Sequence, residues 1–155
     1  MGQISQMYMG INTPFTMYIA NGNWCGQNNT ELWNKGNTLY TMNNNTVYKT
    51  IYDPLPFNYK LPCPAAFSGF SSGSSGYTKG NYFYTGIGGN TIFIPSIGDR
   101  IYVDGSIQEY DLVGDYLTSG PANSNHSIFL YSTQGTTRVN EVNCKAFAFP
   151  IMGVR

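Results

Sequence analysis

The chain has 155 residues, the usual size of one domain, and 41% of them are hydrophobic, so it can bury a core and does not have a disordered composition. Only 10% are charged, against about a quarter in an average protein, and the eight basic and eight acidic residues cancel. Without a basic excess to neutralise phosphates, nucleic acid is excluded as the main partner. No apolar run approaches the length of a membrane span, which excludes membrane insertion.

The expected elements are short and separated by loops. Helical turns are expected at 29–34 and at 64–70, where Pro62 and Pro64 can start a helix. Strands are expected where β-branched and aromatic residues gather: 15–20, 47–52, 82–85, 91–95, 100–103, 128–132 and 145–151. The Asp104-Gly105 pair before Ile107 predicts a hairpin turn. The Gly- and Ser-rich stretch 68–80 predicts a long surface loop.

Four prolines crowd into residues 49–64, KTIYDPLPFNYKLPCP. Proline has no backbone N–H and a fixed φ, so this stretch fits neither a helix interior nor a central strand. It is either a linker between two folded pieces or a fixed loop inside one domain. The second interpretation is preferred, with the loop running from near Tyr52 into the helix at 64–70. The prediction is one domain over 1–155, with 1–14 as a possible extension or linker from a larger protein.

Three cysteines, Cys25, Cys63 and Cys144, leave one thiol unpaired in any redox state. One disulfide of unknown pairing and three free thiols are both open, and no C-x-x-C pair supports a zinc or thioredoxin site. No basic partner that would activate a thiol is evident. The N-terminal residues lack the basic region and apolar run of a signal peptide. An exported protein would then be an excised domain or would leave the cell another way, such as in a virus particle.

Five motifs in order resemble those of a known family. They are NGNWCGQNNTELWN, KTIYDPLPFNYKLPCPAAFSGF, IFIPSIGDRIYVDGSI, VGDYLTSGP and the terminal AFAFPIMGVR, and together they cover about residues 15–155. The family is the Fibrobacter succinogenes major paralogous domain of gut-bacterial surface proteins. The chain departs from its pattern at Leu55 and Gly153, where relatives have Cys, and at Leu117, where relatives have Trp. If those two cysteines pair in relatives, Leu55 and Gly153 should lie close together.

The resemblance implies a C-type-lectin-like fold. The predicted class is therefore α+β: a small twisted antiparallel sheet with one or two short helices and long irregular loops. Formylglycine-generating enzymes and the diversified tip proteins of phages and bacterial adhesins share that architecture. Since a fold does not determine function, the residues must be judged separately.

The residues favour a protein that is not an enzyme. The single histidine, His126, lies in a polar loop, and a nucleophile elbow is absent. Asp111 and Asp115 could form a paired-carboxylate site, but turn roles are favoured for them. The acidic residues are spread among turns and leave a calcium ion possible, although no calcium motif is matched: Asp99, Asp104, Glu109, Asp111 and Asp115. No cofactor and no metal ligand is assigned.

Binding is the preferred function. The surface is built from Asn, Ser, Thr, Gly and Tyr rather than Lys and Glu, as in adaptable binding surfaces. The candidate ligand-binding residues are aromatic or polar residues of expected loops: Trp24, Asn28, Trp33, Asn123, Asn125, His126, Arg138 and Asn140. For the two tryptophans a core position is the main alternative, and for 123–126 the alternative is a hairpin tip without a ligand.

The predicted function is an extracellular module of adhesin or pilus-tip type that binds a glycan or protein on a cell surface. The alternative is a phage fibre or decoration protein on the virion surface, able to form a trimer. The Asn-rich composition also fits a protein diversified by adenine-directed reverse transcription. A formylglycine-generating type of enzyme is disfavoured, since the paired active-site cysteines are missing.

Overall fold

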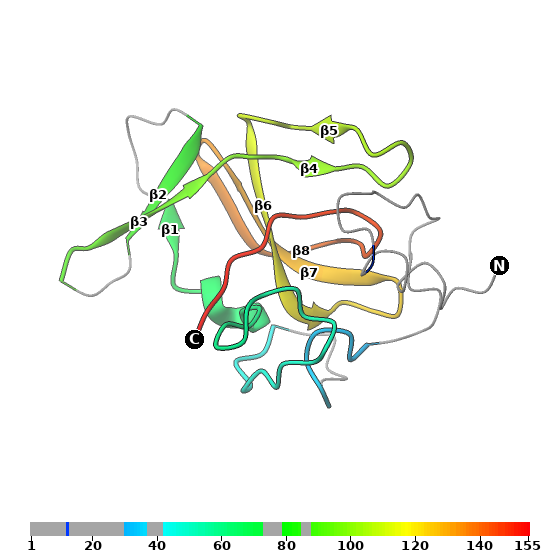
Figure 1. Ribbon diagram of the computed structural model, residues 1–155. Helices are drawn as coiled ribbons and strands as arrows, with labels where there is room; N and C mark the ends of the chain where they lie inside the picture. The colour runs from blue at the N-terminus through cyan, green and yellow to red at the C-terminus, as the bar shows by residue number, and fades with distance from the viewer. Residues whose placement is uncertain (1–11, 13–29, 37–41, 73–78, 85–87) are drawn as a thin grey trace.

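The computed structural model describes residues 12, 30–36, 42–72, 79–84 and 88–155. The described residues form three small antiparallel sheets joined by long loops (Figure 1). The order along the chain is η1 (Pro64–Phe67), β1 (Ser71–Ser72), β2 (Gly80–Tyr84), β3 (Thr91–Pro95), β4 (Asp99–Arg100), β5 (Ile107–Gln108), β6 (Val113–Pro121), β7 (His126–Thr133) and β8 (Thr136–Cys144).

The largest sheet has the order β6-β7-β8, with each strand antiparallel to the next. β7 and β8 are joined by a tight turn at Gln134 and Gly135, where Gly135 has a φ of 88°. This left-handed conformation is open to glycine without steric cost. β8 alternates between exposed and half-buried residues, as expected for a strand with one side toward solvent.

β6 is buried along its whole length because it has a core cluster on each side. Neighbouring residues of a strand point to opposite faces. Tyr116 joins a cluster with Phe67, Phe83, Ile94 and Leu130, while Leu117 joins a cluster with Leu32, Trp33 and Leu61. Among the polar residues of β6, Thr118 is accommodated by a hydrogen bond: its hydroxyl donates to the carbonyl of Ile128 at 2.7 Å.

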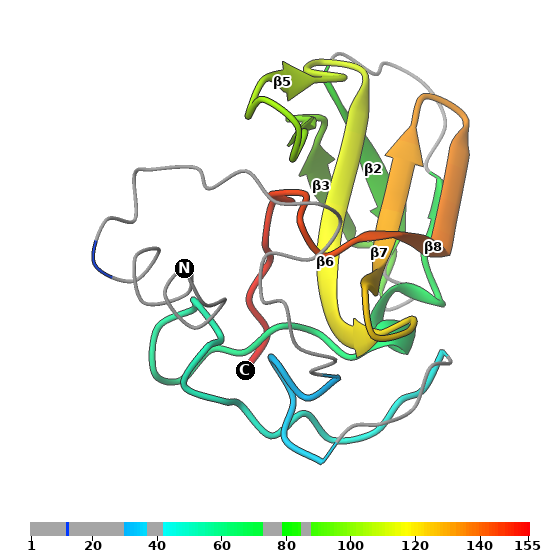
Figure 2. The same cartoon turned by 90° about the vertical axis from the view of Figure 1, so that its right-hand side faces the viewer.

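The C-terminal segment covers the free edge of β6. It runs beside β6 on the side away from β7, as the red ribbon in Figure 2 shows. The N–H of Leu117 donates to the carbonyl of Pro150, and the N–H of Ser119 donates to that of Pro62. Phe149 stacks on Phe129 with ring centroids 4.8 Å apart, which anchors the segment. An edge strand that would expose its backbone groups is thereby paired.

The strand predictions are confirmed in part. The strand over 91–95 is β3, the one over 128–132 lies within β7, and 82–84 lie within β2. The Asp104-Gly105 turn is confirmed, since it joins β4 to β5 and Gly105 has a φ of 75°. The strand over 15–20 lies outside the described residues.

Two strand predictions are wrong, and the strands β1, β6 and β8 are missed. Residues 47–52 contribute one bridge, between Asn34 and Lys49. The stretch 145–151 contributes two, which pair Ala148 with Arg100 and Ile151 with Leu117. A regular strand needs one continuous partner, and neither stretch has one among the described residues. β6 and β8 are missed because they are rich in polar residues, and β4 ends at Arg100, before most of the expected 100–103 strand.

The α+β class is corrected to a mostly antiparallel β structure. Among the described residues, regular helix longer than one turn is absent; η1 is a four-residue 3-10 helix that starts at Pro64, inside the expected 64–70. Residues 30–34 form bends and not the expected helical turn. The small antiparallel sheet and the long irregular loops are confirmed.

Candidate functional site

Three of the predicted binding residues lie together at the turn between β6 and β7. The Asn123 side-chain oxygen Oδ1 accepts hydrogen bonds from the backbone N–H groups of Asn125 (2.8 Å) and His126 (2.9 Å). It also lies 2.8 Å from Nδ1 of the His126 ring. One side chain therefore organises the whole turn, as Asx turns do.

The end of β8 lies against the same turn. His126 is opposite Cys144 in the register, and its Nε2 lies 3.6 Å from the Cys144 sulfur. The buried side chain of Lys145 donates from Nζ to the carbonyl of Ser124 at 3.0 Å. The sequence did not indicate that His126 lies beside Cys144, because the β7–β8 register brings together two residues 18 positions apart.

The other predicted site residues lie elsewhere. Trp33 is buried in the core cluster with Leu61 and Leu117, so the core alternative holds for it. Arg138 and Asn140 are exposed on β8, and Arg138 forms an ion pair of 2.9 Å with Glu141. Six residues of strand separate Arg138 from Cys144, about 20 Å, which places it away from the turn. Trp24 and Asn28 lie outside the described residues.

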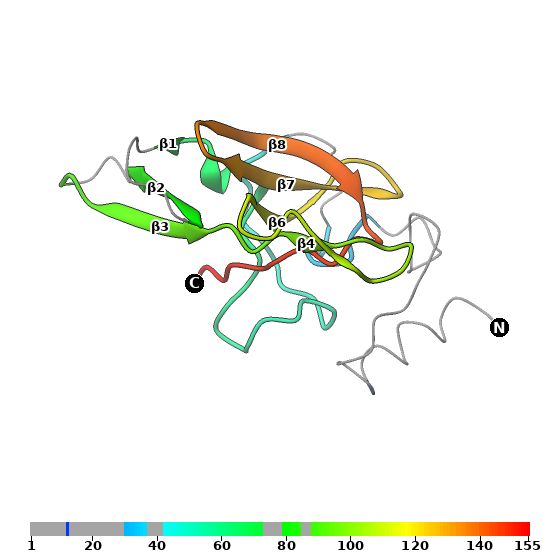
Figure 3. The ribbon, with the colours of Figure 1, turned by 90° about the horizontal axis from the view of Figure 1, so that it is seen from above.

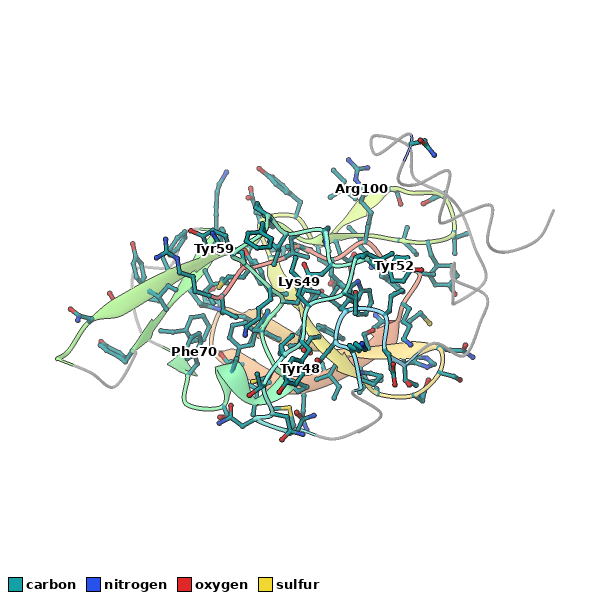
Figure 4. All side chains as sticks on the ribbon, turned by 60° about the horizontal axis from the view of Figure 1, so that its bottom comes forward. Tyr48, Lys49, Tyr52, Tyr59, Phe70 and Arg100 are labelled. Atoms are coloured by element: carbon teal, nitrogen blue, oxygen red, sulfur yellow. The ribbon has the colours of Figure 1, made fainter. Side chains whose placement is uncertain are left out.

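The proline-rich loop, residues 48–59, is fixed by the buried carboxylate of Asp53. Oδ1 of Asp53 accepts a hydrogen bond from the N–H of Leu55, and Oδ2 accepts one from the N–H of Leu61. Nζ of Lys49 lies 2.7 Å from Oδ1 and also donates to the carbonyl of Leu55. Figure 4 shows Lys49 near the middle of this face, with Tyr52 and Tyr59 on either side.

The C-terminal residues also hold this loop. Lys60 and Val154 exchange two backbone hydrogen bonds of 2.9 Å. A Cβ built on Gly153 would lie 3.4 Å from Cδ2 of Leu55, so the predicted closeness of Leu55 and Gly153 is confirmed. The loop carries the chain to η1 at Pro64, as expected for a fixed loop.

Loop 48–59 presents large apolar side chains to solvent. Ile51 is 89% exposed and Phe57 is 88% exposed, and the ring of Tyr48 is also mostly exposed. Figure 3 shows this loop projecting on the side of the molecule opposite to β8. The sequence analysis interpreted the loop as scaffold and missed these residues. An apolar run interrupted by prolines could have indicated them, because prolines keep a segment out of the regular strands and helices that would bury such side chains.

A second cluster of charges lies between β4, β6 and β8. Asp115 is 3% exposed and Asp99 is 5% exposed, and in each the oxygen Oδ1 has no hydrogen-bond partner among the described residues. Burial raises the pKa of Asp115 to about 7, and the charges of Asp99, Glu109 and Glu141 add to the shift. Burial also raises the pKa of Asp99. The expected turn position holds for Asp104, whose Oδ1 accepts from the Ser106 N–H, but not for Asp99 or Asp115, which lie on strands.

In the part of the chain that the structure describes, His, Cys, Asp and Glu side chains form no group of three that could hold a metal ion. Within the same residues, no helix has the length and apolar character needed to cross a bilayer.

Comparison with known proteins gives no match: the sequence fits no family model, and neither curated proteins nor solved structures match it. The resemblance to the Fibrobacter succinogenes major paralogous domain therefore stays a prediction.

Proposed function

We propose that this protein is a ligand-binding module that acts outside the cell, in the manner of an adhesin or pilus tip, and recognises a glycan or protein on a cell surface. The observation that carries the proposal is the nearly complete exposure of Ile51 and Phe57 on a loop fixed by Asp53. Exposing large apolar side chains is unfavourable in water, and a rigid loop that does so is typical of a binding surface.

The chemistry of the loop suits a partner with apolar and hydroxyl groups. Tyr48 follows a run of asparagines in which Asn44 and Asn45 are exposed, so aromatic area is bordered by amides. Aromatic residues supply contact area at low entropic cost, and amides supply adaptable hydrogen bonds. Because loop 48–59 is held at Asp53 and again at Lys60, little further ordering is needed on binding, which favours affinity.

The C-type-lectin-like fold is part of the same proposal. It is supported by the long loops on small antiparallel sheets and by the pairing of Lys60 with Val154 near the end of the chain. The closeness of Leu55 and Gly153 is consistent with it as well, because a disulfide in relatives would join these two positions.

A glycan array and a cell-binding assay with the purified chain test the proposal. The double variant Ile51→Ser/Phe57→Ser should abolish saturable binding. The matched control is Val103→Ser/Ile107→Ser, which removes two exposed apolar side chains from the β4–β5 hairpin and should leave binding unchanged. Absence of saturable binding to both sugars and cells would overturn the proposal.

A third variant, Asn123→Ala/Asn125→Ala/His126→Ala, separates the two candidate surfaces. Loss of binding in this variant alone would move the site to the β6–β7 turn. The alternative function is that of a virion fibre or decoration protein. It is tested by the mass of the purified chain in solution, because a stable trimer would favour it over an adhesin.

A further inference from the structure

His126 and Cys144 form a base–thiol pair at the end of the β6-β7-β8 sheet. The ring nitrogen Nε2 lies 3.6 Å from the sulfur, a normal separation for a hydrogen bond that involves sulfur. Both residues are partly exposed, so a small molecule can reach the pair from solvent. His126 is the single histidine of the chain, which makes this arrangement unique in the protein.

Asn123 determines which ring nitrogen of His126 carries the hydrogen. Oδ1 of Asn123 accepts from two backbone N–H groups, so this atom is the carbonyl oxygen and not the amide nitrogen. Nδ1 of His126, 2.8 Å from the same oxygen, must then be the donor. In the neutral ring this leaves Nε2 as the acceptor that faces the thiol of Cys144.

Cys63 provides a comparison within the same molecule. It is also a free, partly exposed cysteine, but its thiol lies 3.3 Å from the side-chain oxygen of Asn44. An amide oxygen can accept the hydrogen bond but cannot take the proton. A nearby imidazole can, and the thiolate is the reactive form of cysteine.

The surrounding backbone limits the chemistry that such a pair can perform. Acyl transfer needs N–H groups that stabilise an oxyanion. The N–H of Cys144 is already bonded to Oδ1 of Asn143, and that of Lys145 to the carbonyl of Asn125. Exchange with a disulfide requires only an accessible thiolate and a base that accepts the thiol proton.

We propose that Cys144 is a reactive thiol that exchanges with disulfides, with His126 as the base and Asn123 as the residue that positions His126. The thiol proton moves to Nε2 of His126, and the sulfur attacks one sulfur of the disulfide. A bond forms between these two sulfurs and the original S–S bond breaks. The departing sulfur takes the proton from His126. One thiol and one disulfide give a mixed disulfide and a new thiol, without net oxidation.

The disulfide that Cys144 attacks can come from a small molecule or from another protein chain. This proposal does not depend on ligand binding by loop 48–59. The reduced chain is incubated with oxidised glutathione, and the modification of each cysteine is followed by peptide mass mapping. Cys144 should react about tenfold faster than Cys63 or more. In a parallel incubation, the reduced chain is mixed with the disulfide-linked Cys144 dimer of a heavier, tagged copy of this chain; a dimer of intermediate mass on a non-reducing gel shows that a second copy also serves as the disulfide.

Three variants make the test specific. His126→Gln should lower the rate at Cys144 to that of Cys63. Asn123→Ala should lower it in part, and Asn123→Asp, which retains the acceptor, should restore it. Unfolding of a variant would be recognised because the rate at Cys63 would rise as well. Equal rates at Cys63 and Cys144 in the folded wild-type chain, or an unchanged rate in a folded His126→Gln variant, would overturn the proposal.

Discussion

Two regions of the molecule each bury an aspartate, and they do so with opposite consequences. In loop 48–59, Asp53 has a lysine at 2.7 Å and accepts two backbone hydrogen bonds. In the sheet, Asp115 faces the acidic residues Asp99, Glu109 and Glu141, and one of its oxygens has no partner among the described residues. A buried carboxylate is favourable where cations and N–H groups surround it and unfavourable where other acids do. Burial alone does not decide its contribution to stability.

Removing Asp53 should cause the largest loss of stability. Asp53→Ala leaves the N–H groups of Leu55 and Leu61 without their acceptor and leaves Lys49 without its ion-pair partner. We expect a loss of about 3 kcal/mol in the free energy of unfolding, measured in urea. Asp53→Asn retains one acceptor and the shape, so its loss should be smaller. If Asp53→Ala cost no more than a surface substitution, the loop would not be held as described.

Replacing Asp115 should have the opposite sign. Its folded-state pKa of about 7 is above the unfolded value of 3.8, so the folded state binds more protons between these values. The contribution of Asp115 to stability is therefore fully present below pH 4 and is lost as the pH rises toward 7. Asp115→Asn cannot ionise and should be more stable than the wild type at pH 8, by roughly 2–4 kcal/mol. The measurement is thermal and urea unfolding from pH 4 to pH 8.

Asp104→Asn is the matched control for this pH series. Hydrogen bonds from Ser106 lower the pKa of Asp104. The contribution of Asp104 to stability is therefore present at neutral pH and is lost on acidification. The two variants should shift stability in opposite directions at pH 8. If the difference in stability between Asp115→Asn and the wild type does not grow from pH 4 to pH 8, the assignment of Asp115 as a destabilising buried acid is wrong.

Joining the loop to the C-terminal segment should have the smallest effect. In the variant Leu55→Cys/Gly153→Cys, the two new thiols are expected to form a disulfide, because the sites are in contact. The gain over the reduced form should be about 1–3 kcal/mol, since the long closed loop restricts the unfolded chain but Tyr59 must shift to admit the new Cβ. Mass spectrometry and unfolding with and without reductant measure it. Failure to oxidise would show that the loop lies farther from Gly153.

The sequence predicted the elements that local chemistry specifies. The β-branched and aromatic side chains of Thr91–Pro95 predict a strand by themselves. Gly105 predicts the turn between β4 and β5, and Pro64 predicts the start of η1. β6 could not be recognised in this way, because both of its faces are buried while half of its residues are polar or glycine. Its burial follows from segments elsewhere in the chain that cover both faces and its free edge.

For the candidate site, the sequence singled out Asn123, Asn125 and His126, which share one turn because they are neighbours along the chain. It could not pair His126 with Cys144, which depends on the register of β7 and β8. It left Trp33 open between a binding residue and a core residue, and the fold buries it. It also did not distinguish Asp53 from Asp115. The sequence by itself determined the turns, the stiff loop and the polar, nearly uncharged surface, because these depend on residue type and near neighbours. Only the tertiary structure decided which thiol has a base and which buried acid has a cation, because both depend on contacts between distant parts of the chain.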